Sequence, residues 1–245
     1  MGKVACTYPA FIFREFVERV INKMKYLQEI INGRLCNIAE NGTGNATFFL
    51  PLDPDTDGDW QEVPRLVCDI LKDKPFRIIG FKAGDWDREL SPWEAEGVFK
   101  NQRFAGNGIE TLKWLMSDEV SAFAGDEKYI VGYSLGGLFA LWSYYESRRF
   151  KGVASCSGSL WYPGWKEYVA GKETVEDSKI YLSLGDREEK TRNPVMAAIG
   201  DITRKFCDIY KADNKLSDFH FEWNAGNHFA DVHMRLAKGI AWLLL

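Results

Sequence analysis

The 245-residue sequence has few residues of the types that bind metals or form disulfides. It contains three histidines and five cysteines, and no two cysteines have the close spacing of a metal-binding pair. The odd cysteine count and the apolar surroundings of Cys68 and Cys156 favour reduced thiols that pack as small hydrophobic side chains. Because free thiols persist in reducing compartments, we expect a cytoplasmic protein without a disulfide framework.

Long runs of one residue type are also lacking. No segment approaches the roughly 20 apolar residues of a membrane-spanning helix. Arg14, Glu15 and Glu18 interrupt the apolar stretch that a signal peptide would need near the N-terminus. Lys and Arg are scattered and the formal net charge is -4, so the sequence has no basic cluster of the kind that binds nucleic acid or an anionic membrane. Repeats and linker-like segments are absent from the sequence, which favours one domain.

The sequence does contain enough apolar residues, 46% of the total, to bury a large core. Apolar strand-like segments alternate with amphipathic helix-like segments along most of the chain. Strands are predicted at 45–52, 76–84, 128–134, 150–158, 179–185 and 218–226, and helices at 60–73 (beginning near Pro64), 107–123, 135–149, about 194–212 and 229–244. This α/β alternation predicts a mostly parallel central sheet with helices on both faces.

The N-terminal part has a different pattern. Asn32-Gly33 lies between two β-prone runs and predicts a hairpin with a two-residue turn, which would add an antiparallel edge to the sheet. Residues 11–25 have apolar positions at helical spacing, so we expect residues 1–25 to form a helical extension and 26–245 a single domain. The segment 84–107 is too long for an ordinary connection and is a candidate functional loop.

A candidate nucleophile lies in the pattern G-x-S-x-G, formed by residues 132–136 with Ser134 at its centre. A strand is predicted before the serine and a helix after it, and Gly137 would let that helix pack closely. This is the context of a nucleophile elbow, the tight strand-to-helix turn that exposes a serine. The same glycines could also form a plain strand-to-helix turn without chemistry.

A nucleophilic serine needs a base and an acid that orients the base. His228 lies in a glycine-rich loop after the last predicted strand, and catalytic residues of parallel sheets lie in such loops at the carboxyl ends of the strands. His220 is a side chain within a predicted strand and His233 lies inside a predicted helix, so His228 is the candidate base. For the acid we favour Glu188, which follows the preceding strand and can turn back toward the imidazole, with Asp186 as the alternative. The chain order serine, acid, histidine is the order expected for a nucleophile elbow.

These segments resemble the α/β-hydrolase fold and, within it, the putative-esterase group that includes esterase D-like, feruloyl and enterobactin-type siderophore esterases. The resemblance covers about residues 26–245 and is carried by GYSLGG (132–137), SGSLWYPGW (157–165), LGDREEKTRNP (184–194) and GNHF (226–229), with WDRELSPW (86–93) similar to bacterial members. In this group the acid usually stands three residues after the glycine, which supports Glu188. The members cleave very different esters, so the resemblance leaves the substrate open.

The mechanism implied is two-step acyl transfer, in which Ser134 attacks an ester carbonyl while His228 takes its proton. The oxyanion would be held by the backbone N–H of Leu135 and by a second N–H from Asp53 or Leu52, in the loop after the strand at 45–52. This chemistry needs no metal or organic cofactor.

Aromatic residues in two long loops are candidates for the wall of a substrate pocket, although they could equally pack those loops down. The predicted pocket residues are Tyr133, Trp86, Trp93, Trp161 and Tyr162. The expected partner is a small-molecule ester, with no nucleic acid or membrane. A thioesterase or peptidase using the same triad, and a catalytically silent hydrolase-fold binding protein, are the alternatives.

Overall fold

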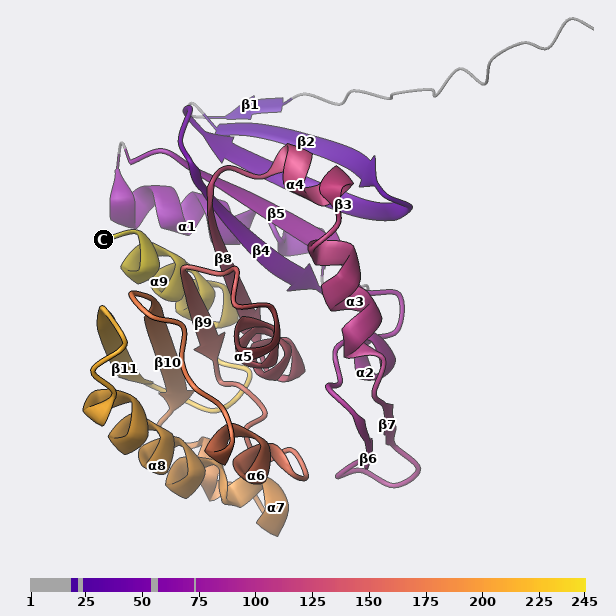
Figure 1. Cartoon of the computed structure of the whole chain (residues 1–245), viewed down its shortest axis with the longest axis vertical. Coiled ribbons are helices and arrows are strands. Elements are labelled where there is room, and N and C mark those ends of the chain that lie inside the picture. The colour runs from indigo at the N-terminus through magenta and orange to yellow at the C-terminus, as the bar shows by residue number, and fades with distance from the viewer. Residues whose placement is uncertain (1–18, 22–23, 54–56, 73) are drawn as a thin grey trace, which may run out of the picture.

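The structure is a computed structural model that describes residues 19–245 except 22–23, 54–56 and 73. Among these residues, nine strands form one twisted sheet in the order β1-β2-β3-β5-β4-β8-β9-β10-β11 (Figure 1). Their bounds are β1 (Arg19–Ile21), β2 (Met24–Ile31), β3 (Arg34–Asn41), β4 (Ala46–Leu52), β5 (Phe76–Lys82), β8 (Glu127–Tyr133), β9 (Gly152–Cys156), β10 (Lys179–Gly185) and β11 (Asp218–Asn224). The strands from β5 across to β11 are parallel, and β1, β2 and β3 add an antiparallel edge, which confirms the predicted sheet.

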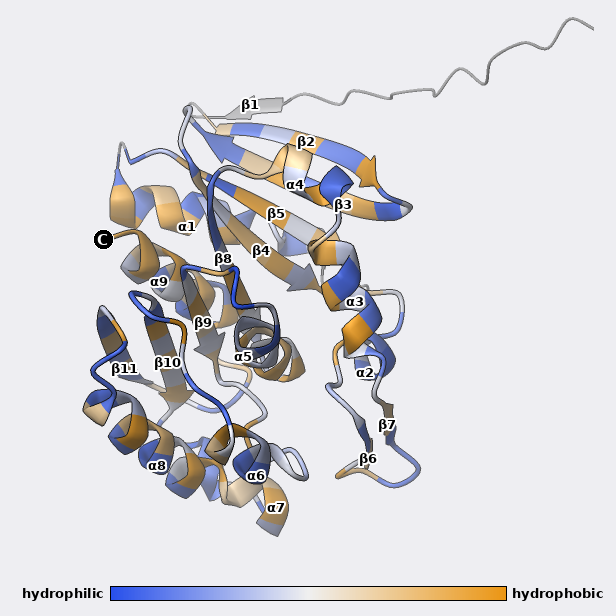
Figure 2. Cartoon of the chain, in the orientation of Figure 1, coloured by the Kyte–Doolittle hydropathy of each residue, from blue (hydrophilic) through white to orange (hydrophobic). Residues whose placement is uncertain are grey.

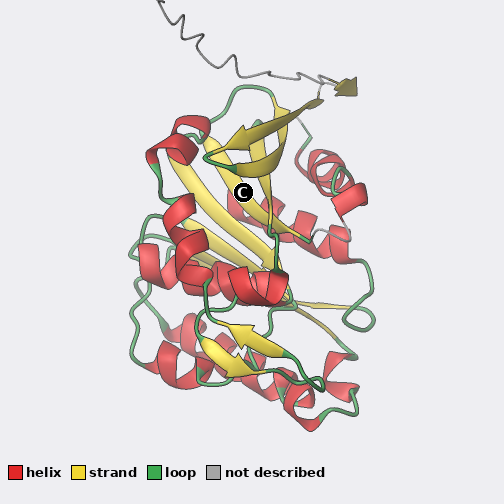
Figure 3. Ribbon diagram, turned by 90° about the vertical axis from the view of Figure 1, so that its right-hand side faces the viewer, coloured by secondary structure: helices red, strands yellow, loops and turns green. Residues whose placement is uncertain are grey.

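Helices cover both faces of the sheet (Figure 3). One face packs against α1 (Glu62–Leu71) and α9 (Val232–Leu244). The other packs against α3 (Gly108–Leu115), α4 (Asp118–Phe123), α5 (Leu135–Ser147), α6 (Trp165–Ala170) and α8 (Ile199–Ala212). Successive strand residues point to opposite faces, so Phe48 lies in one core and Phe49 in the other. β4 is therefore buried along its whole length, and hydrophobic residues dominate the middle of the sheet (Figure 2).

The predicted hairpin is confirmed. β2 and β3 pair in antiparallel register from Met24↔Asn41 to Ile31↔Arg34. Asn32 and Gly33 form the turn with φ of 45° and 77°, the left-handed conformation that a two-residue primed turn requires of both residues.

The predicted helix at 11–25 is wrong wherever the structure describes it. Arg19–Ile21 forms β1, which pairs with Met24–Tyr26 of β2. Residues 24–25, at the end of the predicted helix, are the first two residues of β2. Pairing with the open edge of β2, three to seven residues further along the chain, overrides the helical spacing. Residues 1–18, and with them most of the predicted helical extension, lie outside the described residues.

Three other predicted helices differ in their bounds. The helix at 107–123 is divided into α3 and α4, because Ser117 caps a new helix by accepting a hydrogen bond from the Val120 N–H. The helix at 194–212 is likewise divided into α7 (Pro194–Ala197) and α8. The last helix begins at Val232, since Asp231 has a left-handed backbone with φ of 51°.

The long segment at 84–107 folds into a short helix and a small hairpin, α2 (Trp86–Glu89) with β6 (Glu94–Glu96) and β7 (Arg103–Ala105). The hairpin extends away from the central sheet beside α2 (Figure 1). In the part of the chain that the structure describes, no helix is long and apolar enough to cross a membrane.

Candidate active site

Ser134 lies in a strained turn between β8 and α5. Its φ of 56° and ψ of −123° are a conformation that residues with side chains rarely adopt. The flanking glycines make the turn possible, since a Cβ on Gly132 would overlap the carbonyl oxygen of Gly136. This is the geometry of a nucleophile elbow and not of an ordinary strand-to-helix turn.

The glycine requirement gives a first prediction. Gly132→Ala is expected to lower the free energy of unfolding by about 2 kcal/mol, because the added methyl group must displace backbone atoms. Thermal and urea unfolding would measure the loss. Gly171→Ala is the matched control, since a Cβ there meets its nearest atom at 3.8 Å. Equal stability of both variants would contradict this account of the turn.

His228 lies between the serine and a carboxylate. Its Nε2 atom is 3.0 Å from Ser134 Oγ, and its Nδ1 atom is 2.7 Å from Glu188 Oε2. The three side chains come from the ends of three strands of the sheet: Ser134 follows β8, Glu188 lies in the 3-10 turn η2 (Glu188–Lys190) after β10, and His228 lies in the loop after β11. Parallel strands bring these ends to one edge of the sheet, so residues 94 positions apart touch.

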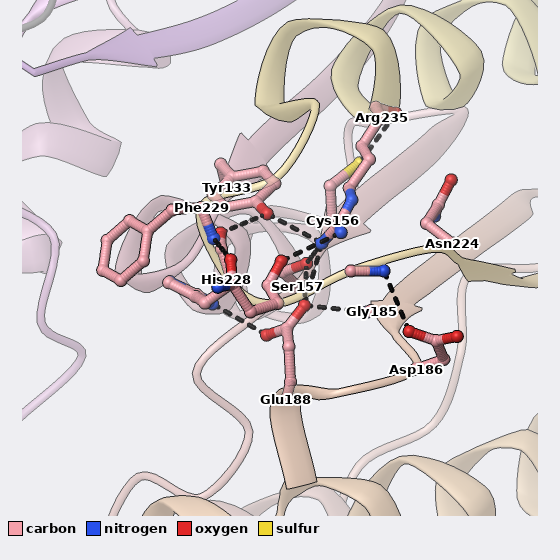
Figure 4. Close-up of polar contacts among 12 residues, drawn as sticks. Tyr133, Cys156, Ser157, Gly185, Asp186, Glu188, Asn224, His228, Phe229 and Arg235 are labelled. Carbon is pink, nitrogen blue, oxygen red and sulfur yellow. Dashed lines mark hydrogen bonds and ion pairs between the residues drawn. The ribbon is translucent and has the colours of Figure 1, made fainter. Parts of the chain in front are cut away.

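The alternative acid, Asp186, does not contact His228. Its Oδ1 atom accepts a hydrogen bond of 2.8 Å from the Gly226 N–H, and its own N–H donates to the carbonyl oxygen of Asn224. Figure 4 shows Asp186 directed away from the imidazole while Glu188 faces it. Asp186 therefore fastens the loop that carries His228, and Glu188 contacts the imidazole.

The Glu188 carboxylate is buried, with 8% of the residue exposed, and is held by several donors. Oε1 accepts hydrogen bonds from Ser157 Oγ and the Gly185 N–H, both at 2.7 Å. Burial raises the pKa of Glu188, but the hydrogen bonds from His228, Ser157 and Gly185 outweigh it and hold the pKa below its ordinary value. The side chain is therefore a carboxylate at neutral pH.

Arg235 is the main site residue that sequence reasoning missed. It is fully buried on α9 and its Nη1 atom donates to Glu188 Oε1 at 2.9 Å. A signal was available, because Arg235 occupies a position on the buried stripe of the last helix, together with Val232, Leu236 and Gly239. A charged residue on such a stripe is rarely buried without a partner.

A cavity of about 270 Å³ opens beside Ser134 and His228. Six of the predicted site residues line it, namely Leu52, Asp53, Trp86, Tyr133, Ser134 and His228, and the other lining residues are Leu50, Pro51, Trp60, Val63, Phe229, Val232, His233 and Leu236. The wall is mainly apolar and aromatic, as is usual in small-molecule sites. A second cavity of about 260 Å³ shares His228 and Phe229 with the first and is lined by Trp161.

Two predicted pocket residues, Trp93 and Tyr162, line neither of these cavities. Trp93 Nε1 donates to the Pro163 carbonyl oxygen at 2.8 Å, and the Tyr162 hydroxyl donates to the Trp93 carbonyl oxygen at 2.5 Å. Their rings also meet edge to face, 5.7 Å apart. These contacts fasten the 84–107 segment onto the 157–165 segment, which is the loop-packing role that the sequence left open for both residues.

The predicted oxyanion donors lie on two sides of the serine. Leu135 is the first residue of α5, where backbone N–H groups have no acceptor within the helix. Leu52 ends β4 and Asp53 follows it, and both line the cavity that contains Ser134. Among the described residues, no group of three or more His, Cys, Asp or Glu side chains could hold a metal ion.

A family model with the description putative esterase matches residues 70–242, a span that contains Ser134, Glu188 and His228. No curated protein sequence matches the chain significantly.

Several solved structures share the fold. The siderophore hydrolase EstA from Aspergillus nidulans has a TM-score of 0.70 at 14% identity, covering 94% of this chain and 98% of that one. An IroE-like serine hydrolase from Shewanella oneidensis has a TM-score of 0.70 at 16% identity, with 89% and 79% covered. The enterobactin esterase FES from Shigella flexneri has a TM-score of 0.60 at 18% identity, and the match covers 90% of this chain but 58% of that one.

Proposed function

We propose that this chain, which belongs to the putative esterase family and is an ester hydrolase, cleaves its substrate by two-step acyl transfer at Ser134. The observation that carries the proposal is the continuous contact from Ser134 Oγ through His228 to Glu188, at 3.0 and 2.7 Å, beside a cavity. In this scheme Ser134 is the nucleophile, His228 the general base and Glu188 the acid that orients the imidazole.

The first half-reaction forms an acyl-enzyme. Ser134 Oγ bonds to the ester carbonyl carbon while its proton passes to His228 Nε2. The bond from that carbon to the alcohol oxygen then breaks, and His228 returns the proton to the departing oxygen. In the second half-reaction water takes the place of the alcohol, and the carboxylic acid leaves.

The negative charge on the carbonyl oxygen needs N–H donors during both steps. The Leu135 N–H at the start of α5 suits this role, together with an N–H from Asp53 or Leu52 across the cavity. Each such donor lowers the barrier by about 3 kcal/mol in related chemistry.

The cavity supports a small-molecule ester with an apolar group as the substrate. Trp86, Tyr133 and Phe229 give its wall aromatic faces, and a volume of about 270 Å³ accommodates a group of modest size. The siderophore hydrolases among the structural neighbours make esters of siderophore type one class to include in a substrate panel.

Trapping the acyl-enzyme tests the proposal directly. Rapid mixing with p-nitrophenyl acetate is expected to give a burst of p-nitrophenolate and a protein whose mass has increased by one acetyl group, located on the peptide that contains Ser134. A panel of acetyl, feruloyl, short-chain and siderophore-type esters would then identify the preferred acyl group. Turnover with the acetyl group on any other residue would overturn the assignment.

A further inference from the structure

The structure points to Arg235 as a positioning residue for the reaction, one that holds the Glu188 carboxylate and the His228 loop as a single unit. This inference rests on the proposed roles of Ser134, Glu188 and His228. Arg235 would act through these residues and does not itself touch the substrate.

The burial of Arg235 is the first observation. Its side chain is 0% exposed, and that of Glu188 is 5% exposed. A buried charge costs several kcal/mol unless it is paired and hydrogen-bonded, so a fold retains one only where its contacts offset that cost. The guanidinium makes five polar contacts at 2.9 to 3.0 Å: Nη1 shares its two hydrogens among Tyr133 Oη, Ser157 Oγ and Glu188 Oε1, and Nη2 donates to the carbonyl oxygens of Ala225 and Asn227.

The acid side of this network fixes the orientation of the carboxylate. Oε1 of Glu188 accepts from Arg235, Ser157 and the Gly185 N–H, which leaves Oε2 for His228 Nδ1. Figure 4 shows these donors converging on Oε1. Turning the carboxylate would break all of these contacts at once, so the acid has one orientation available.

The base side of the network fixes the loop. Nη2 of Arg235 donates to the carbonyl oxygens of residues 225 and 227, which precede His228 in the chain. Nη1 contacts the Tyr133 hydroxyl, which itself donates to the His228 carbonyl oxygen at 2.7 Å. One side chain therefore sets the backbone of the histidine relative to the carboxylate that it must meet.

Charge gives Arg235 a second, measurable effect. The guanidinium neutralises Glu188, so a proton added to His228 makes the group positive overall. Removing the guanidinium would leave a net negative charge and favour the protonated imidazole. The other ionisable groups around the pair are Tyr133, Cys156, Asp186, Arg187 and Lys190 on the adjoining strand ends and Asp53 and His233 in the first cavity. Of these, Tyr133 loses its contact with Nη1 in Arg235→Met.

The experiment compares Arg235→Met with Arg235→Lys in ester hydrolysis. Arg235→Met is expected to lower kcat on the order of 100-fold with little change in KM, because the reacting groups lose their alignment. The acidic limb of its kcat/KM profile should move to higher pH by roughly one unit. Arg235→Lys keeps the charge, so its limb should stay in place while kcat falls.

Lys238→Met is the matched control. Lys238 lies one turn further along α9, where it pairs with Glu222 and donates to Asn224, outside the network. Its kinetics and pH profile should match the wild type.

A wild-type kcat in Arg235→Met would overturn the proposal, and so would a loss of kcat with an unmoved limb, which would mean that Arg235 only supports the fold. If Arg235→Met does not fold, the test uses Arg235→Lys instead. A wild-type kcat in Arg235→Lys would then overturn the proposal. Ser134→Ala separates this result from the proposed function. If that variant keeps wild-type turnover, the proposed triad itself is wrong.

Discussion

Ser134→Ala is expected to lower kcat for p-nitrophenyl acetate by about 10⁶-fold, leaving only the rate due to binding and oxyanion stabilisation. The reason is that Oγ is the atom 3.0 Å from His228 Nε2, and the alanine methyl group can neither attack nor give up a proton. The backbone of the elbow should tolerate the change, because Ser134 has no side-chain hydrogen bond that caps α5.

A fluorophosphonate probe provides an independent measurement. It should label the wild-type protein on Ser134 and fail to label Ser134→Ala. Ser147→Ala is a suitable control, since Ser147 lies at the other end of α5 and its hydroxyl donates to the Ser143 carbonyl oxygen. Label on another residue, or wild-type turnover by Ser134→Ala, would rule out Ser134 as the nucleophile.

The sheet could be predicted because its signals are local. Most central strands are short apolar runs followed by a helix-like segment, and the Asn32-Gly33 turn needs the left-handed backbone that those two residues adopt readily. The edge strand β1 could not be predicted in this way. Its conformation comes from pairing with Met24–Tyr26, and helical spacing in residues 11–25 carries no information about that partner.

Two residues of the candidate site could also be predicted from the sequence. Chain order and strand ends were enough to bring Ser134 and His228 together, since parallel strands present their ends at one edge. The choice between Asp186 and Glu188 depends on how the loop at 226 folds, because that loop determines which carboxylate is already engaged by the Gly226 N–H.

The pocket was the least predictable part. Aromatic residues in loops follow no periodic pattern that would indicate which way their side chains face, so the sequence does not distinguish Trp86 from Trp93. In the structure Trp86 lines the cavity, whereas Trp93 packs against Tyr162. Arg235 was missed for a related reason. A single arginine in a helix is usually expected at the surface, and its place on the buried stripe of α9 indicates a partner without identifying Glu188 as that partner.

Glu188→Gln is expected to lower kcat by about 10⁴-fold. The Oε1 position faces three donors, from Arg235, Ser157 and Gly185, so the amide oxygen of glutamine should occupy it. The amide NH₂ group then faces His228 Nδ1 and forces that atom to accept a hydrogen bond. The imidazole proton must move to Nε2, where it points at Ser134 and prevents the histidine from taking the serine proton.

Asp186→Asn is the matched control for this change, since it also replaces one carboxylate oxygen with an amide within the same loop. The amide oxygen of asparagine can still accept from the Gly226 N–H, so kcat should remain within a few-fold of the wild type. Steady-state kinetics of the two variants side by side measure the difference. Equal small losses would show that neither carboxylate orients His228, and a large loss in Asp186→Asn alone would transfer the role to Asp186.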